Sequence, residues 1–161
     1  MTNAKVKRSE FKTFMNTTPA TSATYKLIGT GVNSGKINYN PKTNEETDID
    51  QDSASISVES YAPTLPIEAI AVNGDDVFEF VDGLRKSRAV LSAAETDIVN
   101  VWLYETPTSG AYPAEKQPVS IQIDDFGGDG GQAVKINYTI NFLGSPTLGT
   151  FNPTTKTFTA S

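Results

Sequence analysis

The sequence contains neither cysteine nor histidine among its 161 residues. Without cysteine there can be no disulfide framework, thiolate zinc site or thiol nucleophile, and the composition fits assembly in a reducing cytoplasm. Without histidine the chain lacks the commonest general base and the commonest metal ligand. Only carboxylate, lysine or oxygen-ligated metal chemistry remains. We therefore expect a protein that is not an enzyme and needs no cofactor.

Long apolar runs are also missing. No run approaches the roughly 20 residues of a membrane helix, and the first residues lack the apolar core of a signal peptide. We expect a soluble chain that is neither exported nor bound to a membrane. The length suits a single domain with a core that needs no metal or disulfide.

Positive charge is scarce in the middle of the chain. The net charge is −6, and no lysine or arginine occurs from Thr43 to Leu84. Such an acidic surface repels a phosphate backbone, so we do not expect the domain to bind nucleic acid. Cations gather instead near the beginning, at Lys5, Lys7, Arg8 and Lys12.

These cations lie in a polar segment, residues 1–23, which we predict to be an extended arm preceding one β-rich domain, residues 24–161. Its sizeable apolar residues are Phe11, Phe14 and Met15. A disordered tail does not normally carry such side chains, so we expect this stretch to dock on its own domain or on a neighbour.

Most of the domain has the period-2 alternation of β-strands. The strictest case is 54–61, where Ile56 and Val58 lie on one face, which we expect to meet a core. The last long strands should pair across the glycine-rich segment 124–131. Strands are predicted at 24–29, 35–40, 54–61, 67–72, 96–105, 118–125 and 133–143, and a small hairpin at 149–159.

One helix is predicted, at about residues 74–88. The apolar residues Val77, Phe80, Val81 and Leu84 repeat with helical spacing. Asn73 can cap the helix, acidic residues fill the first turn and basic residues the last, as the helix dipole favours.

A long acidic loop is expected from Asn40 to Ser53. Its Asp48, Asp50 and Asp52, with Glu59, have the spacing of a calcium-binding loop, but Ser53 stands where that motif requires glycine. A solvated loop, or one that meets a basic neighbour, explains the acids better.

Two further groups have simpler explanations than chemistry. Asp124, Asp125 and Asp129 could ligate a metal or act as paired carboxylates, but their glycine-rich surroundings favour a turn. Trp102 and Tyr104 could stack on a sugar or base, but no basic residues alternate with them, so a core or interface role is favoured.

The order of these features resembles a known family. It comprises a basic arm, Tyr25-Lys-Leu-Ile-Gly-Thr-Gly-Val32, an acidic loop, one helix, and the segment Ile123 to Gly144 around Phe126-Gly-Gly-Asp-Gly-Gly131, followed by Gly149-Thr-Phe151. Over most of its length the chain is similar to the major tail tube proteins of long-tailed, non-contractile bacteriophages.

The resemblance implies two packed antiparallel sheets, sandwich- or barrel-like, with one flanking helix. It implies hexameric rings that stack around a tape-measure protein and whose lumen conducts DNA without binding it specifically. Other implied partners are the tail terminator and the baseplate or tip proteins. The implied location is the virion, after assembly in the host bacterial cytoplasm.

Two site hypotheses follow from the resemblance and from charge. The acidic loop would make the contact between rings, and the basic arm would be its electrostatic partner. Some carboxylates between Glu45 and Asp82 would face the lumen or the next ring. The loop residues are Glu45, Glu46, Asp48, Asp50 and Asp52, and the arm residues are Lys5, Lys7, Arg8, Phe11 and Phe14.

Two alternatives stay open. One is a carbohydrate-binding or adhesion β-sandwich with Trp102 and Tyr104 as its platform. The other is a hydrolase that works through paired carboxylates.

Overall fold

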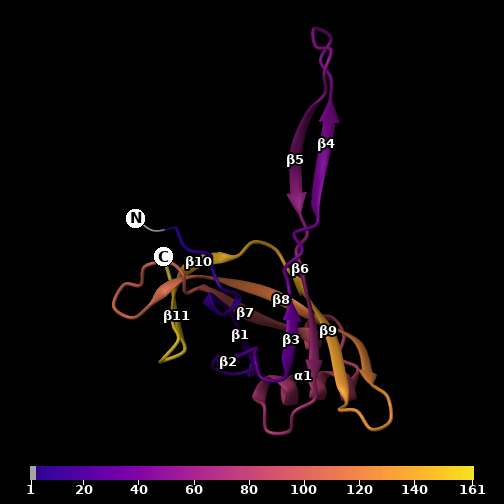
Figure 1. Cartoon of the computed structure of the whole chain (residues 1–161), viewed down its shortest axis with the longest axis vertical. Helices are drawn as coiled ribbons and strands as arrows, with labels where there is room; N and C mark the ends of the chain where they lie inside the picture. The colour runs from indigo at the N-terminus through magenta and orange to yellow at the C-terminus, as the bar shows by residue number, and fades with distance from the viewer. Residues whose placement is uncertain (1–2) are drawn as a thin grey trace.

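The computed structural model describes residues 3–161, which form a mainly β structure with a single α-helix (Figure 1). This confirms the predicted fold class. The strands are β1 (Phe11–Asn16), β2 (Tyr25–Leu27), β3 (Val32–Gly35), β4 (Pro41–Glu46), β5 (Ser55–Tyr61), β6 (Thr64–Ile70), β7 (Glu95–Trp102), β8 (Tyr112–Gly127), β9 (Lys135–Phe142), β10 (Thr147–Asn152) and β11 (Thr157–Ala160). The helix is α1 (Asp76–Ser87), and two 3-10 turns are η1 (Arg8–Glu10) and η2 (Leu91–Ala94).

Nine strands form one antiparallel sheet in the order β2-β1-β7-β8-β9-β6-β3, with β10 and β11 attached through β8. The expected packed layers take the form of one curled sheet because the 16-residue strand β8 runs through both parts. Its first half pairs with β10, its last half with β9, and β7 pairs along the middle.

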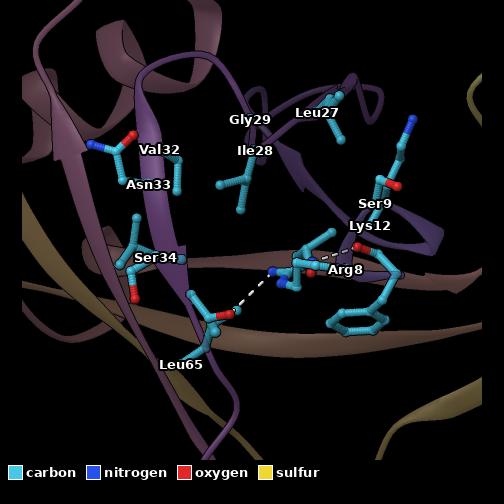
Figure 2. A pocket seen from close by; sticks show the side chains of 14 residues that line it. Arg8, Ser9, Lys12, Leu27, Ile28, Gly29, Val32, Asn33, Ser34 and Leu65 are labelled. Carbon is cyan, nitrogen blue, oxygen red and sulfur yellow. Dashed lines mark hydrogen bonds between the residues drawn. The ribbon is translucent and has the colours of Figure 1, made fainter. Parts of the chain in front are cut away.

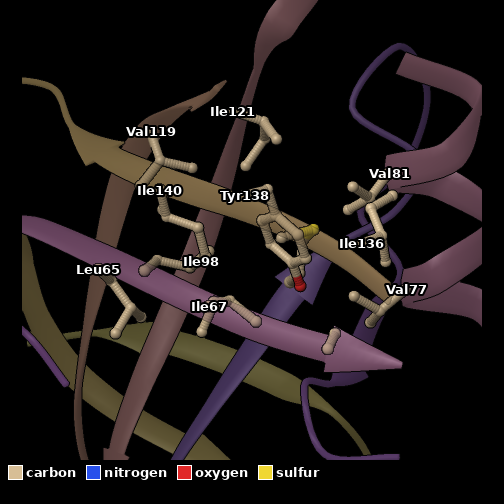
Figure 3. Packing of buried hydrophobic residues seen from close by; sticks show 12 residues of the cluster. Leu65, Ile67, Val77, Val81, Ile98, Val119, Ile121, Ile136, Tyr138 and Ile140 are labelled. Atoms are coloured by element: carbon tan, nitrogen blue, oxygen red, sulfur yellow. The ribbon is translucent and has the colours of Figure 1, made fainter. Parts of the chain in front are cut away.

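The main core fills the inside of this curl (Figure 3). Ile98 of β7, Ile140 of β9 and Leu65 of β6 are almost wholly buried there. Helix α1 covers one end of the core with Val77 and Val81, as the predicted spacing requires.

The helix begins later than predicted, and Asp75 caps it in place of Asn73. The Asp75 carboxylate accepts a hydrogen bond of 3.0 Å from the Phe78 backbone N–H. Gly74 has a φ of +88°, so the chain turns before the helix can start. Arg88 ends the helix in the left-handed conformation.

A second cluster lies on the opposite face of β1 and β7. The Phe14 ring packs against Phe151 with centroids 4.7 Å apart, and Tyr25 meets Phe151 edge-on. The predicted C-terminal hairpin is confirmed as β10 and β11, with Phe151 opposite Phe158. Strands β1 and β7 are therefore covered on both faces.

The predicted arm is partly a strand of the sheet. Phe11–Asn16 pairs with β7 as β1, which confirms that this stretch docks on its own domain. The Thr13 hydroxyl donates to Asn100 Oδ1 at 2.8 Å, and Asn16 Nδ2 donates to Asp97 at 2.9 Å. Because these partners satisfy its polar groups, a polar segment can occupy a buried position.

The predicted loop at residues 40–53 contains a strand in its first half. Residues 41–46 form β4, which pairs with β5 as a two-stranded hairpin that projects away from the rest of the chain (Figure 1). This strand could not be recognised in the sequence because its side chains are polar. Both of its faces are solvated, so its sequence needs no alternation of apolar and polar residues.

Other strands are shifted from their predicted bounds: β6 begins at Thr64 where 67 was predicted, and β8 begins at Tyr112, six residues before the predicted 118. β3 occupies Val32–Gly35 where 35–40 was predicted, and Asn38 makes only an isolated bridge to Thr64. β7 ends at Trp102, before the predicted 105. Within residues 3–161 no helix is long and apolar enough to cross a membrane.

Candidate assembly surfaces

The β4–β5 hairpin is the most exposed element of the chain. Its strands pair only with each other, and its base is held by Asn40, whose side-chain amide donates to the Ala62 carbonyl at 3.0 Å. Ile56 is 70% exposed and Val58 is 53% exposed. The prediction that these side chains meet a core within the subunit is therefore wrong.

The two faces of the hairpin differ in polarity. Ile56 lies opposite Glu45 and Val58 opposite Thr43, so one face carries the apolar side chains. The other face pairs Asn44 with Ser57 and Glu46 with Ser55. A hairpin of two strands is at best marginally stable alone, and one with exposed apolar groups gains stability when a partner covers them.

The hairpin is also strongly acidic. It carries six carboxylates between Pro41 and Tyr61 against the single cation Lys42, which pairs with Glu59 at 3.5 Å. Glu45 and Glu46 lie on β4, while Asp48, Asp50 and Asp52 lie in the connection between the strands. Within residues 3–161 no group of three or more acidic side chains is arranged to hold a metal ion. The structure thus places all five predicted residues together on one exposed element.

The predicted arm residues divide into exposed and internal ones. Lys5 and Lys7 are exposed. Arg8 bridges two strands, because its guanidinium donates to the Phe11 carbonyl at 2.6 Å and to the Gly35 carbonyl at 3.1 Å (Figure 2). Phe11 is half-buried beneath Arg8.

Phe14, which was predicted as part of an assembly arm, lies inside its own chain, and its role in assembly stays a prediction. It is only 3% exposed and belongs to the core of its own subunit. The alternating burial of β1 sends Phe14 towards Phe151 and Met15 towards the main core.

A hollow of about 380 Å³ separates the β1–β2 edge from β3. We name it the seam hollow. Leu27, Ile28, Val32, Leu65 and Ile67 provide apolar walls, and Arg8 and Lys12 are its charged lining residues (Figure 2). It could not be predicted from the sequence, because its walls come from four separate strands, the η1 turn and the segment between β2 and β3.

The outer side of β6, β8 and β9 is polar, opposite the main core. Asp124 accepts hydrogen bonds from Gln122 at 2.6 Å and from the Thr139 hydroxyl at 2.7 Å, and Asp125 accepts one from Asn137 at 2.8 Å. We name this surface the polar face; its residues are Glu68, Ser120, Gln122, Asp124, Asp125, Asn137, Thr139 and Asn141.

The polar face changes the interpretation of the glycine-rich segment. Asp124 and Asp125 lie within β8, at an irregularity in its pairing with β9, and not in the turn. Asp129 lies in the turn, as predicted, and Gly127, Gly128 and Gly131 there have positive φ.

Trp102 and Tyr104 do not share a strand, because β7 ends at Trp102 and Tyr104 lies in the following turn. With Phe11 and Tyr39 they line an open hollow of about 500 Å³. Burial and the negative charge of Glu115 raise the pKa of Tyr39, so this ring stays neutral at physiological pH. A platform for a sugar remains a hypothesis.

Comparison with solved structures gives the class of this fold. The chain is similar to a chain of the tail of an empty GTA (gene transfer agent) particle, determined by helical refinement with C6 symmetry. The match covers 97% of this chain and 100% of that chain, with a TM-score of 0.65 and 12% sequence identity. This chain therefore has a phage-like tail fold.

No family model and no curated protein matches the chain. The likeness thus lies in the three-dimensional arrangement and extends over 97% of this chain.

Proposed function

We propose that this protein is a structural subunit that polymerises into stacked hexameric rings, forming the tube of a phage-like tail. The observation that carries the proposal is the end-to-end fold match to the tail of a GTA particle with C6 symmetry. The hairpin supports it, because its strands carry exposed apolar and acidic side chains and pair with no other strand of residues 3–161.

The hairpin is the proposed contact between rings, with Glu45, Glu46, Asp48, Asp50 and Asp52 facing a basic surface of the next subunit. Its exposed apolar side chains supply the driving force, since full burial of an Ile or Val side chain is worth about 1.5–3 kcal/mol. The cations of the arm, Lys5, Lys7, Arg8 and Lys12, supply the opposite charge.

The polar face is the proposed lining of the lumen. It carries the carboxylates Glu68, Asp124 and Asp125, while Ile70 and Lys135 lie on the same side of their strands at its end. An acidic, hydrogen-bonded wall repels phosphate and lets DNA pass without specific binding.

The proposed location is the virion, and the proposed partners are the tape-measure, terminator and baseplate or tip proteins.

Electron microscopy of the purified protein tests the proposal. We expect rings or hollow tubes with six-fold symmetry after concentration. A protein that stays monomeric at all concentrations contradicts it. Glycan binding by such a monomer, lost on Trp102→Ala, would support the carbohydrate-binding alternative.

A further inference from the structure

We propose that Ile49, at the tip of the hairpin, inserts into the seam hollow of another copy of the chain, while Asp48 and Asp50 meet Lys12 and Arg8 at its rim. This inference rests on the proposed function and adds to it the residues that make the contact. It replaces a general attraction between an acidic loop and a basic arm with one knob and one hollow.

Ile49 has the properties of a knob. It is the most exposed large apolar residue of the described chain, at 106% relative exposure, and acidic residues flank it on both sides. A turn in which the Gln51 N–H donates to the Asp48 carbonyl at 3.0 Å presents it at the tip. Single exposed apolar side chains are common on protein surfaces. The position of Ile49 at the tip of a projecting hairpin makes it available to a matching apolar site on another copy.

The tip cannot reach the seam hollow of its own chain. Ile49 lies eight positions after Pro41, which at ~3.3 Å per residue places the tip about 25 Å from the base of the hairpin. The hairpin points away from the sheet that contains the hollow (Figure 1). The occupant must therefore come from a second copy.

The seam hollow has the chemistry of a receptor for an aliphatic side chain. Leu65 and Ile67, which line it, belong to the main core and are 1% and 3% exposed. The side chains of Ile28 and Val32 lie next to each other in its wall (Figure 2). An aliphatic occupant would extend the core outward across the gap between β1 and β3.

The charges at the rim are free to bind carboxylates. Lys12 makes no ion pair with any residue of the described range 3–161. Two N–H groups of the Arg8 guanidinium donate to backbone carbonyls. A guanidinium has five N–H donors, so Arg8 can also donate to a carboxylate. No acidic residue lines the seam hollow.

Other hollows fit the tip less well. The hollow at the end of α1 includes Asp125, and its Arg85 already pairs with Asp82 at 2.7 Å. The hollow at the base of the hairpin includes Glu115 and no cation. The one beside Trp102 and Tyr104 shares Arg8 but is an open aromatic surface.

Disulfide trapping tests the contact directly, because the chain has no native cysteine. Tubes of the double variant Ile49→Cys/Leu27→Cys should form covalently linked chains of subunits on oxidation, seen as a ladder on non-reducing gels. In the matched control Ile49→Cys/Val90→Cys, the second cysteine is exposed but lies outside the hollow. Tubes of this control should give only the monomer band on the same gel. Tubes with no ladder, or with equal ladders in both variants, would overturn the inference.

Charge exchange provides a second measurement if the cysteine variants fail to assemble. Lys12→Glu and Asp48→Lys/Asp50→Lys should each lower tube yield at least tenfold, and combining them should restore most of it. A combined variant as defective as its parents contradicts the inference. The proposed function is judged separately by whether the wild-type protein forms tubes. If it does not, both proposals fail; if it does and trapping and charge exchange fail, only the contact is wrong.

Discussion

Asp82 shows how individual residues set the stability of the subunit. It lies on α1, where Arg85 approaches it at 2.7 Å and Lys86 at 3.1 Å. Burial opposes its ionisation, but the hydrogen bonds and charges of these two cations outweigh burial and lower the pKa of the carboxyl. Arg85 also stacks on the Phe126 ring, 3.8 Å from its centroid, so Asp82 orients a side chain that ties α1 to the end of β8.

We expect Asp82→Asn to destabilise the subunit by about 1 kcal/mol at pH 7, which corresponds to a fall in Tm of about 2–4 °C. Because the folded-state pKa is lowered, the stabilisation by Asp82 is present above the pKa of the unfolded carboxyl, near ~3.9. It is lost as the pH falls from there through the folded-state pKa.

Thermal unfolding of both proteins between pH 2 and pH 7 measures this difference. The two Tm values should converge at the acidic end. A gap that stays constant across the range would show that the carboxylate charge is not responsible.

At the scale of the element, the hairpin separates the stability of the subunit from its assembly. Ile56→Ser/Val58→Ser should change the free energy of unfolding of the free subunit by no more than about 0.5 kcal/mol, because both side chains are already exposed. The same variant should lose most of its tube yield, because the apolar face of the hairpin is removed.

The control variant Ile140→Ala lies in the fully buried core and should cost about 2–5 kcal/mol. Chemical denaturation and tube counts by electron microscopy distinguish the two effects. If the serine variant were as unstable as Ile140→Ala, the hairpin would belong to the fold of its own subunit.

Elements with strong apolar periodicity could be predicted from the sequence, and those without it could not. The spacing of Val77 and Val81 placed the helix, and alternation placed the second half of β8, β9 and the C-terminal hairpin. Strand β1 was missed because Thr13 and Asn16 are polar and buried only through hydrogen bonds to distant partners. Strand β4 was missed because both of its faces are solvated within one chain.

At the scale of the whole molecule, alternation identifies a two-faced strand but not what covers its apolar face. Ile56 and Ile140 have the same kind of pattern around them, yet one is exposed and the other is buried. A neighbouring copy and the chain's own core select for the same periodicity. The acidic residues of the site were therefore predictable as a cluster, whereas the seam hollow depends on contacts far apart in sequence.

The part of the curled sheet made by β6, β8 and β9 has an apolar inner side and a polar outer side, and the proposed lumen can be located by labelling. Gln122→Cys places a thiol on the polar face, and Thr155→Cys places one in the exposed turn between β10 and β11. After assembly, a maleimide-linked gold particle should appear inside the channel for the first variant only. Gold from Gln122→Cys on the outer wall would show that another surface lines the lumen.

The projecting hairpin also gives the assembly a direction. Insertion of a knob from one copy into a hollow of the next is a head-to-tail contact. Such a contact leaves a free knob at one end and a free hollow at the other, whereas a two-fold contact pairs both surfaces and ends growth. One terminal ring would present six free hairpins and the other six empty hollows. A factor that stops growth at the first end must offer a basic apolar socket, and a factor that starts growth at the second must offer an acidic aliphatic plug. The two ends of the tube would thus require chemically opposite caps.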